Sequence, residues 1–160
     1  MAASGFKVVS SEWARASRKQ TWDFIVPVPL PDYFTGLKPA IPAISEVTDQ
    51  TGDWNSAGQT RTIHLADGSH VHETIDEVET GSAFRYTVGP FNGPVGLLVK
   101  HAKGEFVFED MAGGTYVRWS YTWVPKNGAA APVVWALSKL WGVYANRVLV
   151  RLVQGAGSEA

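Results

Sequence analysis

Six segments in which apolar and polar residues alternate occupy most of the sequence between residues 43 and 124. Alternation with a period of two puts every second side chain on the same face of a strand. Short turns that contain glycine separate the segments, which is typical of an antiparallel meander. We therefore expect one antiparallel sheet with a single buried face. Its predicted strands are residues 43–50, 58–66, 70–79, 83–89, 103–110 and 115–124.

The residues before this sheet predict one more strand and two short helices. Residues 6–13 are rich in the β-branched and aromatic side chains that favour strands. Ser17 is a suitable N-cap for a helix over 18–26, which the following prolines end. A second short helix is expected over 32–36, with Gly36 closing it. The sheet then has about seven strands.

A long helix is predicted after the sheet. Pro132 suits its first turn, and Gly155 and Gly157 are expected to end it. Because no other long helix is predicted, we expect this one to lie across the concave face of a curved sheet, with space for a cavity at the open end. The fold class is α+β. The apolar stripe of the helix consists of Val133, Leu137, Leu140, Trp141, Tyr144, Val148 and Leu152.

The composition limits the class of function. A length of 160 residues predicts a single domain, with an ordered core over about 6–155. The absence of cysteine excludes disulfides and thiolate chemistry, and a net charge of −1 gives no reason to expect a nucleic-acid partner. No apolar run is long enough for a membrane span, and no signal peptide is recognisable, so a cytoplasmic location is the simplest expectation.

Aromatic residues are more abundant than a small core needs. The chain has seven Trp, seven Phe and five Tyr, while charged residues make up 18% against an average of about 25%. Each ring alone is more often a packing residue than a ligand contact, but together such rings line sites for apolar or polycyclic ligands. Strand alternation gives no place to Trp54 or Trp135.

The hairpin between the second and third strands of the meander sets which charges face inward. A three-residue loop, Asp67-Gly68-Ser69, would place Leu65 opposite Val71 and keep the apolar faces together. Arg61 and Glu73 then become diagonal neighbours on the inner face. They form either a structural ion pair or a polar group that orients a ligand in a cavity.

The predicted ligand-binding residues are those whose side chains point inward by strand or helix parity. Glu73 is also the candidate catalytic residue, as an acid or base. The full set is Arg61, Ile63, Leu65, Glu73, Ile75, Phe84, Tyr86, Phe106, Phe108, Trp119, Tyr121, Trp123, Leu137, Trp141 and Tyr144.

Neither a metal site nor a cofactor site is predicted. His64 and His72 are expected to face each other on the outer face of the hairpin, but a third ligand for zinc is missing. The sequence contains neither a phosphate-binding glycine loop nor a nucleophile elbow.

Short motifs spread along the chain support a family assignment. They are Asp49-Gln50-Thr51-Gly52-x-Trp54, Ala57-Gly58-Gln59-Thr60-Arg61-Thr62-Ile63, Leu65-x-Asp67-Gly68, Glu73, Tyr86 and Gly114-Thr115-x-Val117-x-Trp119. With the order of elements, they resemble the START-like (SRPBCC) superfamily and its polyketide cyclase/dehydrase and lipid-transport branch. The resemblance covers nearly the whole chain, and it is more specific for fold than for function.

This resemblance implies a helix-grip fold with a deep cavity between the sheet and the C-terminal helix. Members bind lipids, sterols, plant hormones or polyketides, and some catalyse cyclisation or dehydration. In related hormone receptors, an inward glutamate on the strand after a gate loop contacts the ligand, and Glu73 matches that position, with Leu65 to Ser69 as the gate. The loop residues Ala66 to Ser69 depart from the receptors' sequence, so hormone-gated partner binding is not expected.

Three functions remain open. The first is binding or transfer of a hydrophobic small molecule, such as a lipid, a polyketide or another polycyclic ligand. The second is an enzyme of the polyketide cyclase/dehydrase type that uses Glu73. The third is a membrane-surface or protein-interaction module that uses the basic and apolar last helix. The oligomeric state is not predicted.

Overall fold

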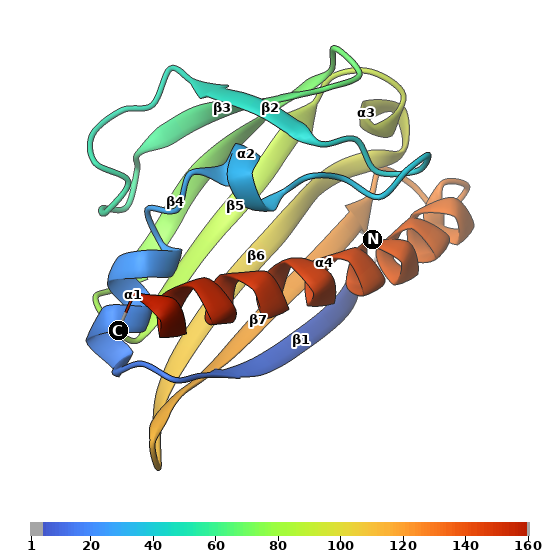
Figure 1. Ribbon diagram of the computed structural model, residues 1–160. Coiled ribbons are helices and arrows are strands. Elements are labelled where there is room, and N and C mark those ends of the chain that lie inside the picture. Colours follow the sequence, from blue (N-terminus) through green and yellow to red (C-terminus); the bar gives the residue numbers. More distant parts are fainter. Residues whose placement is uncertain (1–4, 160) are drawn as a thin grey trace.

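A seven-stranded antiparallel sheet curves around a long C-terminal helix in the computed structural model, which describes residues 5–159 (Figure 1). This is the arrangement that the sequence predicts. The strand order is β1-β7-β6-β5-β4-β3-β2, so β1 closes one edge beside β7. The strands are β1 (Phe6–Ala14), β2 (Ile44–Thr48), β3 (Thr60–Leu65), β4 (His70–Glu79), β5 (Ala83–Phe91), β6 (Val99–Met111) and β7 (Gly114–Pro125). The helices are α1 (Arg18–Ile25), α2 (Leu30–Tyr33), α3 (Val95–Leu98) and α4 (Ala131–Ser158).

Helix α1 begins as its sequence predicts. The Ser17 side chain accepts a hydrogen bond from the backbone N–H of Gln20, and the Gln20 side chain accepts one from the backbone N–H of Ser17. This reciprocal capping box satisfies two backbone donors that the first turn leaves free. Trp22 of this helix meets Phe108 of β6 edge to face, with 5.2 Å between the ring centroids. Helix α1 therefore closes one end of the concave face.

Two short helices differ from the sequence prediction. Helix α2 spans Leu30–Tyr33 rather than 32–36, because Pro31 fits a first helical turn and starts the helix earlier. Helix α3 (Val95–Leu98) was not predicted, because four residues are too few for a periodic pattern. Strand β6 starts directly after it, at Val99, and not at residue 103.

Helix α4 continues through the two glycines that were predicted to end it, as far as Ser158. At Gly155 the helix passes close to α1 and α2. A Cβ atom there would lie 2.5 Å from Cζ of Phe24 and 2.9 Å from the Tyr33 hydroxyl oxygen. Gly155 is therefore present for close packing and not as a helix cap.

Most of the predicted stripe on α4 faces the sheet, but its first residue does not. Tyr144, Val148 and Leu152 are buried, whereas Val133 is 52% exposed. In the first turns of α4 the buried side of the helix runs through Val134 and Ser138, which are 0% and 1% exposed, so Val133 beside them points to solvent. Within residues 5–159, no helix is both long and apolar enough to cross a membrane.

We predict that Gly155→Ala lowers the free energy of unfolding by about 1–3 kcal/mol, because the added methyl group overpacks the contact with Phe24. Denaturant unfolding followed by circular dichroism measures this. The matched control is Gly142→Ala in the same helix, where a Cβ would meet Val8 at an ordinary 3.5 Å. That variant should be neutral or stabilised by up to about 1 kcal/mol. Equal effects at both positions would contradict the packing role of Gly155.

Candidate functional site

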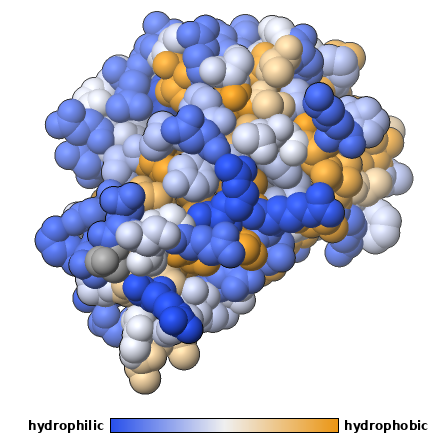
Figure 2. Space-filling model, in the orientation of Figure 1, coloured by the Kyte–Doolittle hydropathy of each residue, from blue (hydrophilic) through white to orange (hydrophobic). Residues whose placement is uncertain are grey.

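A cavity of about 340 Å³ lies between the concave face of the sheet and α4. One end is formed by the tip of the β3–β4 hairpin, the loop between β5 and α3, and the first half of α4. Figure 2 shows apolar side chains at the surface near the start of α4 among largely hydrophilic neighbours. Among the exposed apolar residues, Leu97 belongs to α3, directly after that loop, and Val133 to the start of α4. The cavity is therefore bounded by regular strands on one side and by loops and a helix on the other.

The structure places most of the predicted site residues in the wall of this cavity. Ile75 and Phe108 are exceptions, since neither lines it. Phe108 is covered by Trp22 of α1, and Ile75 is 1% exposed within the packed core. Inward parity identifies the buried face, but it does not tell where along a strand the core ends and the cavity begins. The predicted residues that line the cavity are Arg61, Ile63, Leu65, Glu73, Phe84, Tyr86, Phe106, Trp119, Tyr121, Trp123, Leu137, Trp141 and Tyr144.

The β3–β4 hairpin brings Arg61 and Glu73 directly opposite each other, not diagonally. Its three-residue loop is Ala66-Asp67-Gly68, one residue earlier than predicted, and Leu65 pairs with Ser69 through an N–H···O=C bond of 2.9 Å. Such loops put their left-handed residue last, and Gly68 has φ +89°. The pairing moves by two residues along the partner strand, which preserves the inward face.

Arg61 and Glu73 form a buried ion pair in the cavity wall. Nε and Nη2 of Arg61 both donate to Oε1 of Glu73, at 2.9 and 2.6 Å. The two residues are 8% and 6% exposed. Among the described residues, no hydrogen bond reaches Oε2 of Glu73 or Nη1 of Arg61. Each partner therefore neutralises the other and keeps one polar atom unused.

Trp54 covers the Arg61 side of this ion pair, a role that the sequence did not reveal. Its ring centroid lies 3.9 Å from Cζ of Arg61, a cation–π distance, and the ring meets Phe84 edge to face. The indole is 2% exposed although it comes from the loop between β2 and β3. That loop has no periodicity to reveal an inward side chain. The only sequence feature that pointed to this contact was the predicted inward side chain of Arg61, because a buried guanidinium needs a neighbouring group that packs against it.

Two tyrosine hydroxyls add polar atoms to the cavity wall. Tyr86 accepts a hydrogen bond of 2.9 Å from Nε1 of Trp119, and Tyr121 also lines the cavity. Burial, with the nearby Glu73 charge as a smaller cause, raises the pKa of both phenols, so both stay protonated. Gly104 opposes Tyr86 in the β5–β6 ladder, and a Cβ there would overlap the tyrosine ring.

The rest of the wall is mainly aromatic. Tyr121 of β7 and Trp141 of α4 have ring centroids 4.7 Å apart, and Phe106 stacks on Trp119 at 4.9 Å. Aromatic rings from the sheet and from α4 therefore meet across the end of the cavity. An apolar and flat ligand would find ring faces and edges on several sides.

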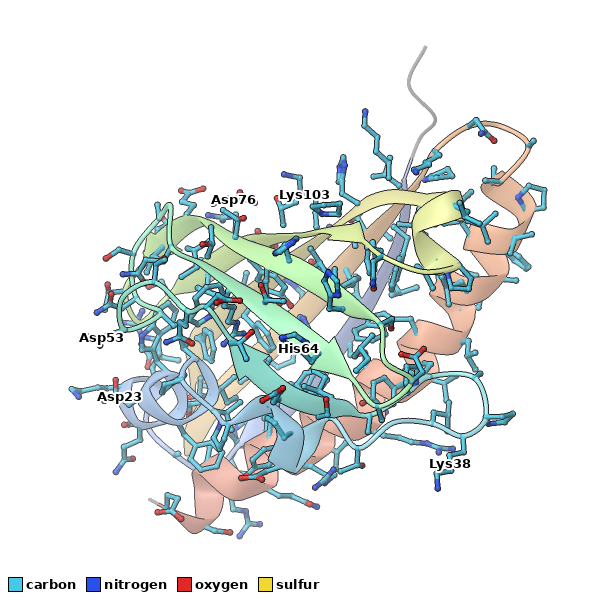
Figure 3. The ribbon with its side chains drawn as sticks, turned by 90° about the horizontal axis from the view of Figure 1, so that it is seen from above. Asp23, Lys38, Asp53, His64, Asp76 and Lys103 are labelled. Atoms are coloured by element: carbon cyan, nitrogen blue, oxygen red, sulfur yellow. The ribbon has the colours of Figure 1, made fainter. Side chains whose placement is uncertain are left out.

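The other ion pairs that involve the strands lie on exposed surface. Arg85 binds Glu77, Glu79 and Glu105, which holds the pKa of Arg85 above its usual range, with the hydrogen bond to Glu105 the largest cause. Asp76 and Lys103 lie near each other on the face of the sheet away from α4 (Figure 3). These charges do not line the cavity.

The histidines do not pair as predicted. His64 is opposite His70, and His72 is opposite Thr62. His64 instead shares a hydrogen bond of 2.7 Å with the Thr48 hydroxyl. The correction follows from the same two-residue change of register. Within residues 5–159, no group of three or more possible ligands is placed to hold a metal ion.

Comparisons with known proteins agree with this geometry. The family model described as "Polyketide cyclase / dehydrase and lipid transport" matches residues 6–156. No curated protein sequence matches the chain. Solved structures with the same fold include Ara h 8.0201 (16% identity, TM-score 0.63, covering 94% of this chain and 99% of that one). A protein from Nitrosospira multiformis gives 19% identity and TM-score 0.65, covering 96% and 98%. An uncharacterised protein from Bacillus thuringiensis gives 20% and 0.61, covering 95% and 98%.

We predict that Arg61→Met costs about 3 kcal/mol of the free energy of unfolding, because it leaves the buried Glu73 carboxylate without its partner. The double variant Arg61→Met/Glu73→Leu should recover most of this loss. Arg85→Met, which breaks half-exposed pairs on the outer face, is the control and should cost about 1 kcal/mol or less. Denaturant unfolding of the set provides the measurement. A double variant that is no more stable than Arg61→Met alone would contradict this explanation of the loss.

Proposed function

Because the chain belongs to the START-like family of polyketide cyclase/dehydrase and lipid-transport proteins, we propose that it binds one hydrophobic small molecule in the cavity between the sheet and α4. The observation that carries this proposal is an aromatic cavity whose wall contains a single buried ion pair. Ligand sites are typically apolar cavities with a few placed polar groups. The family and fold support hydrophobic ligand binding, and the identity of the ligand is part of the proposal.

The arrangement of polar atoms gives the bound ligand an orientation. Its apolar body packs against the rings of Trp119, Tyr121 and Trp141. Its polar group reaches Oε2 of Glu73 or Nη1 of Arg61, which the hydrogen bonds within the ion pair leave unused, or the Tyr121 hydroxyl. A ligand with no polar atom would leave these groups without partners, which costs free energy.

The volume favours a compact ligand. About 340 Å³ lies near the lower end of the range of roughly 300–1,000 Å³ for small-molecule sites. A molecule of a few fused rings, or a short chain, fits this volume better than a lipid with two acyl chains.

The first test is ligand uptake with a variant that fills the cavity. We expect the protein to bind the uncharged dye Nile red, with a blue-shifted emission, and Val71→Trp to weaken binding at least about tenfold because the indole occupies ligand space. Val107→Trp is the matched control: Val107 is half-buried on the outer face of β6 and does not line the cavity. Failure of the wild type to take up Nile red, or equal loss in both variants, would count against the proposed site.

A second candidate function is catalysis on the bound molecule. The observation that favours it is the free Oε2 of Glu73 in a wall that also holds two protonated tyrosines, so a carboxylate base and hydroxyl donors share one cavity. Polyketide-like polycyclic precursors incubated with the protein would then be recovered with a changed mass, through cyclisation or loss of water. Glu73→Gln should return them unchanged while still binding Nile red. Unchanged precursors with the wild type would leave binding as the function.

A further inference from the structure

The charges in the cavity wall determine which ligands can enter. We infer that this cavity selects uncharged polar ligands over anionic ones of the same shape, and that Glu73 is the residue that rejects anions. This inference rests on the proposed function and adds the chemical class of the ligand. It depends on three observations. Arg61 and Glu73 neutralise each other, the tyrosine hydroxyls are uncharged, and the charge at the tip of the β3–β4 hairpin is negative.

The positive charge of Arg61 is already compensated. Two of its N–H groups are directed to one oxygen of Glu73, and Trp54 covers the guanidinium. A ligand carboxylate that approached Nη1 would also approach the ionised Glu73, and two carboxylates repel each other strongly where water is scarce. An anion would therefore enter without a free cation to pair with, and an unpaired buried charge is costly.

No other cation among the lining residues replaces Arg61. The remaining ionisable groups of the wall are Asp67, His70 and three tyrosines. Asp67 lies exposed at the hairpin tip, where hydrogen bonds from Ser69 lower its pKa and keep it ionised. His70 lies on the same hairpin, outside the buried ion pair, and its backbone N–H binds Asn92. The hairpin tip therefore adds the negative charge of Asp67 to this end of the cavity.

An uncharged polar group meets a different environment. An amide, ketone or alcohol can donate to Oε2 of Glu73 or accept from Nη1 of Arg61 and from the tyrosine hydroxyls. These bonds leave the ion pair closed and add no net charge. The cavity thus offers donors and an acceptor to a neutral ligand while denying a counter-ion to an anion.

The experiment compares two probes of nearly equal shape, anthracene-2-carboxamide and anthracene-2-carboxylate, by fluorescence titration near pH 7, where the acid is ionised. We expect the wild type to bind the amide at least about tenfold more tightly, because burying the unpaired carboxylate costs 1.4 kcal/mol or more. Equal affinities, or tighter binding of the carboxylate, would overturn the inference and leave the proposed function intact. A protein that binds Nile red but neither anthracene derivative would also overturn the inference. Uptake of none of the three would contradict the proposed function itself.

Variants then identify the residue responsible. Glu73→Gln leaves the Arg61 charge without a partner, so the preference should reverse toward the carboxylate. Arg61→Gln/Glu73→Gln has no charge at either position and should again prefer the amide. Glu105→Gln is the control, because it removes the same charge from an Arg–Glu pair outside the cavity, and it should behave as the wild type. Circular dichroism confirms that each variant is folded, and the wild-type comparison stands even if Glu73→Gln does not fold. A Glu73→Gln protein that folds and keeps the wild-type preference would overturn the role of Glu73.

Discussion

One helix has to cover the concave face of seven strands. A curved antiparallel sheet leaves a wide apolar surface on its inner side, and α4 with the short α1 and α2 can cover only part of it. Large rings from β7 and α4 bridge some of the distance, with Tyr121 and Trp141 in contact across it. Where the rings do not meet, a cavity of about 340 Å³ remains. The high aromatic content and the cavity are thus consequences of the same geometry.

The ion pair of Arg61 and Glu73 gives this apolar space its chemistry. An isolated charge could not remain in such a wall, but two opposite charges at 2.6 Å, covered by Trp54, can. The cost is that each partner loses part of its capacity to bind a ligand ion. Arg61 and Glu73 neutralise each other, which lets both remain in the core. Because neither is then a free counter-ion, we expect neutral ligands.

Several features could be predicted from residue patterns because they depend on local periodicity. Alternation identified the strands and the inward side of Arg61, Glu73 and Tyr86, and the 3.6-residue period identified most of the buried stripe of α4. The features that were missed lack a local signal. Trp54 lies in an irregular loop, and α3 is four residues long. Gly155 resembles a helix cap until α1 is known to pass beside it.

The sequence by itself determined the class of the fold and the face on which each strand residue lies, because side-chain direction in a strand or helix follows from the backbone period alone. It also determined the family, which the match over residues 6–156 establishes. Only the tertiary structure decided that Arg61 stands directly opposite Glu73 and that Trp54 lies over the Arg61 guanidinium. It also decided that Ile75 and Phe108 are packed in the core while their neighbours line a cavity. These outcomes depend on register, sheet curvature and contacts between residues distant in the chain, which no local pattern encodes.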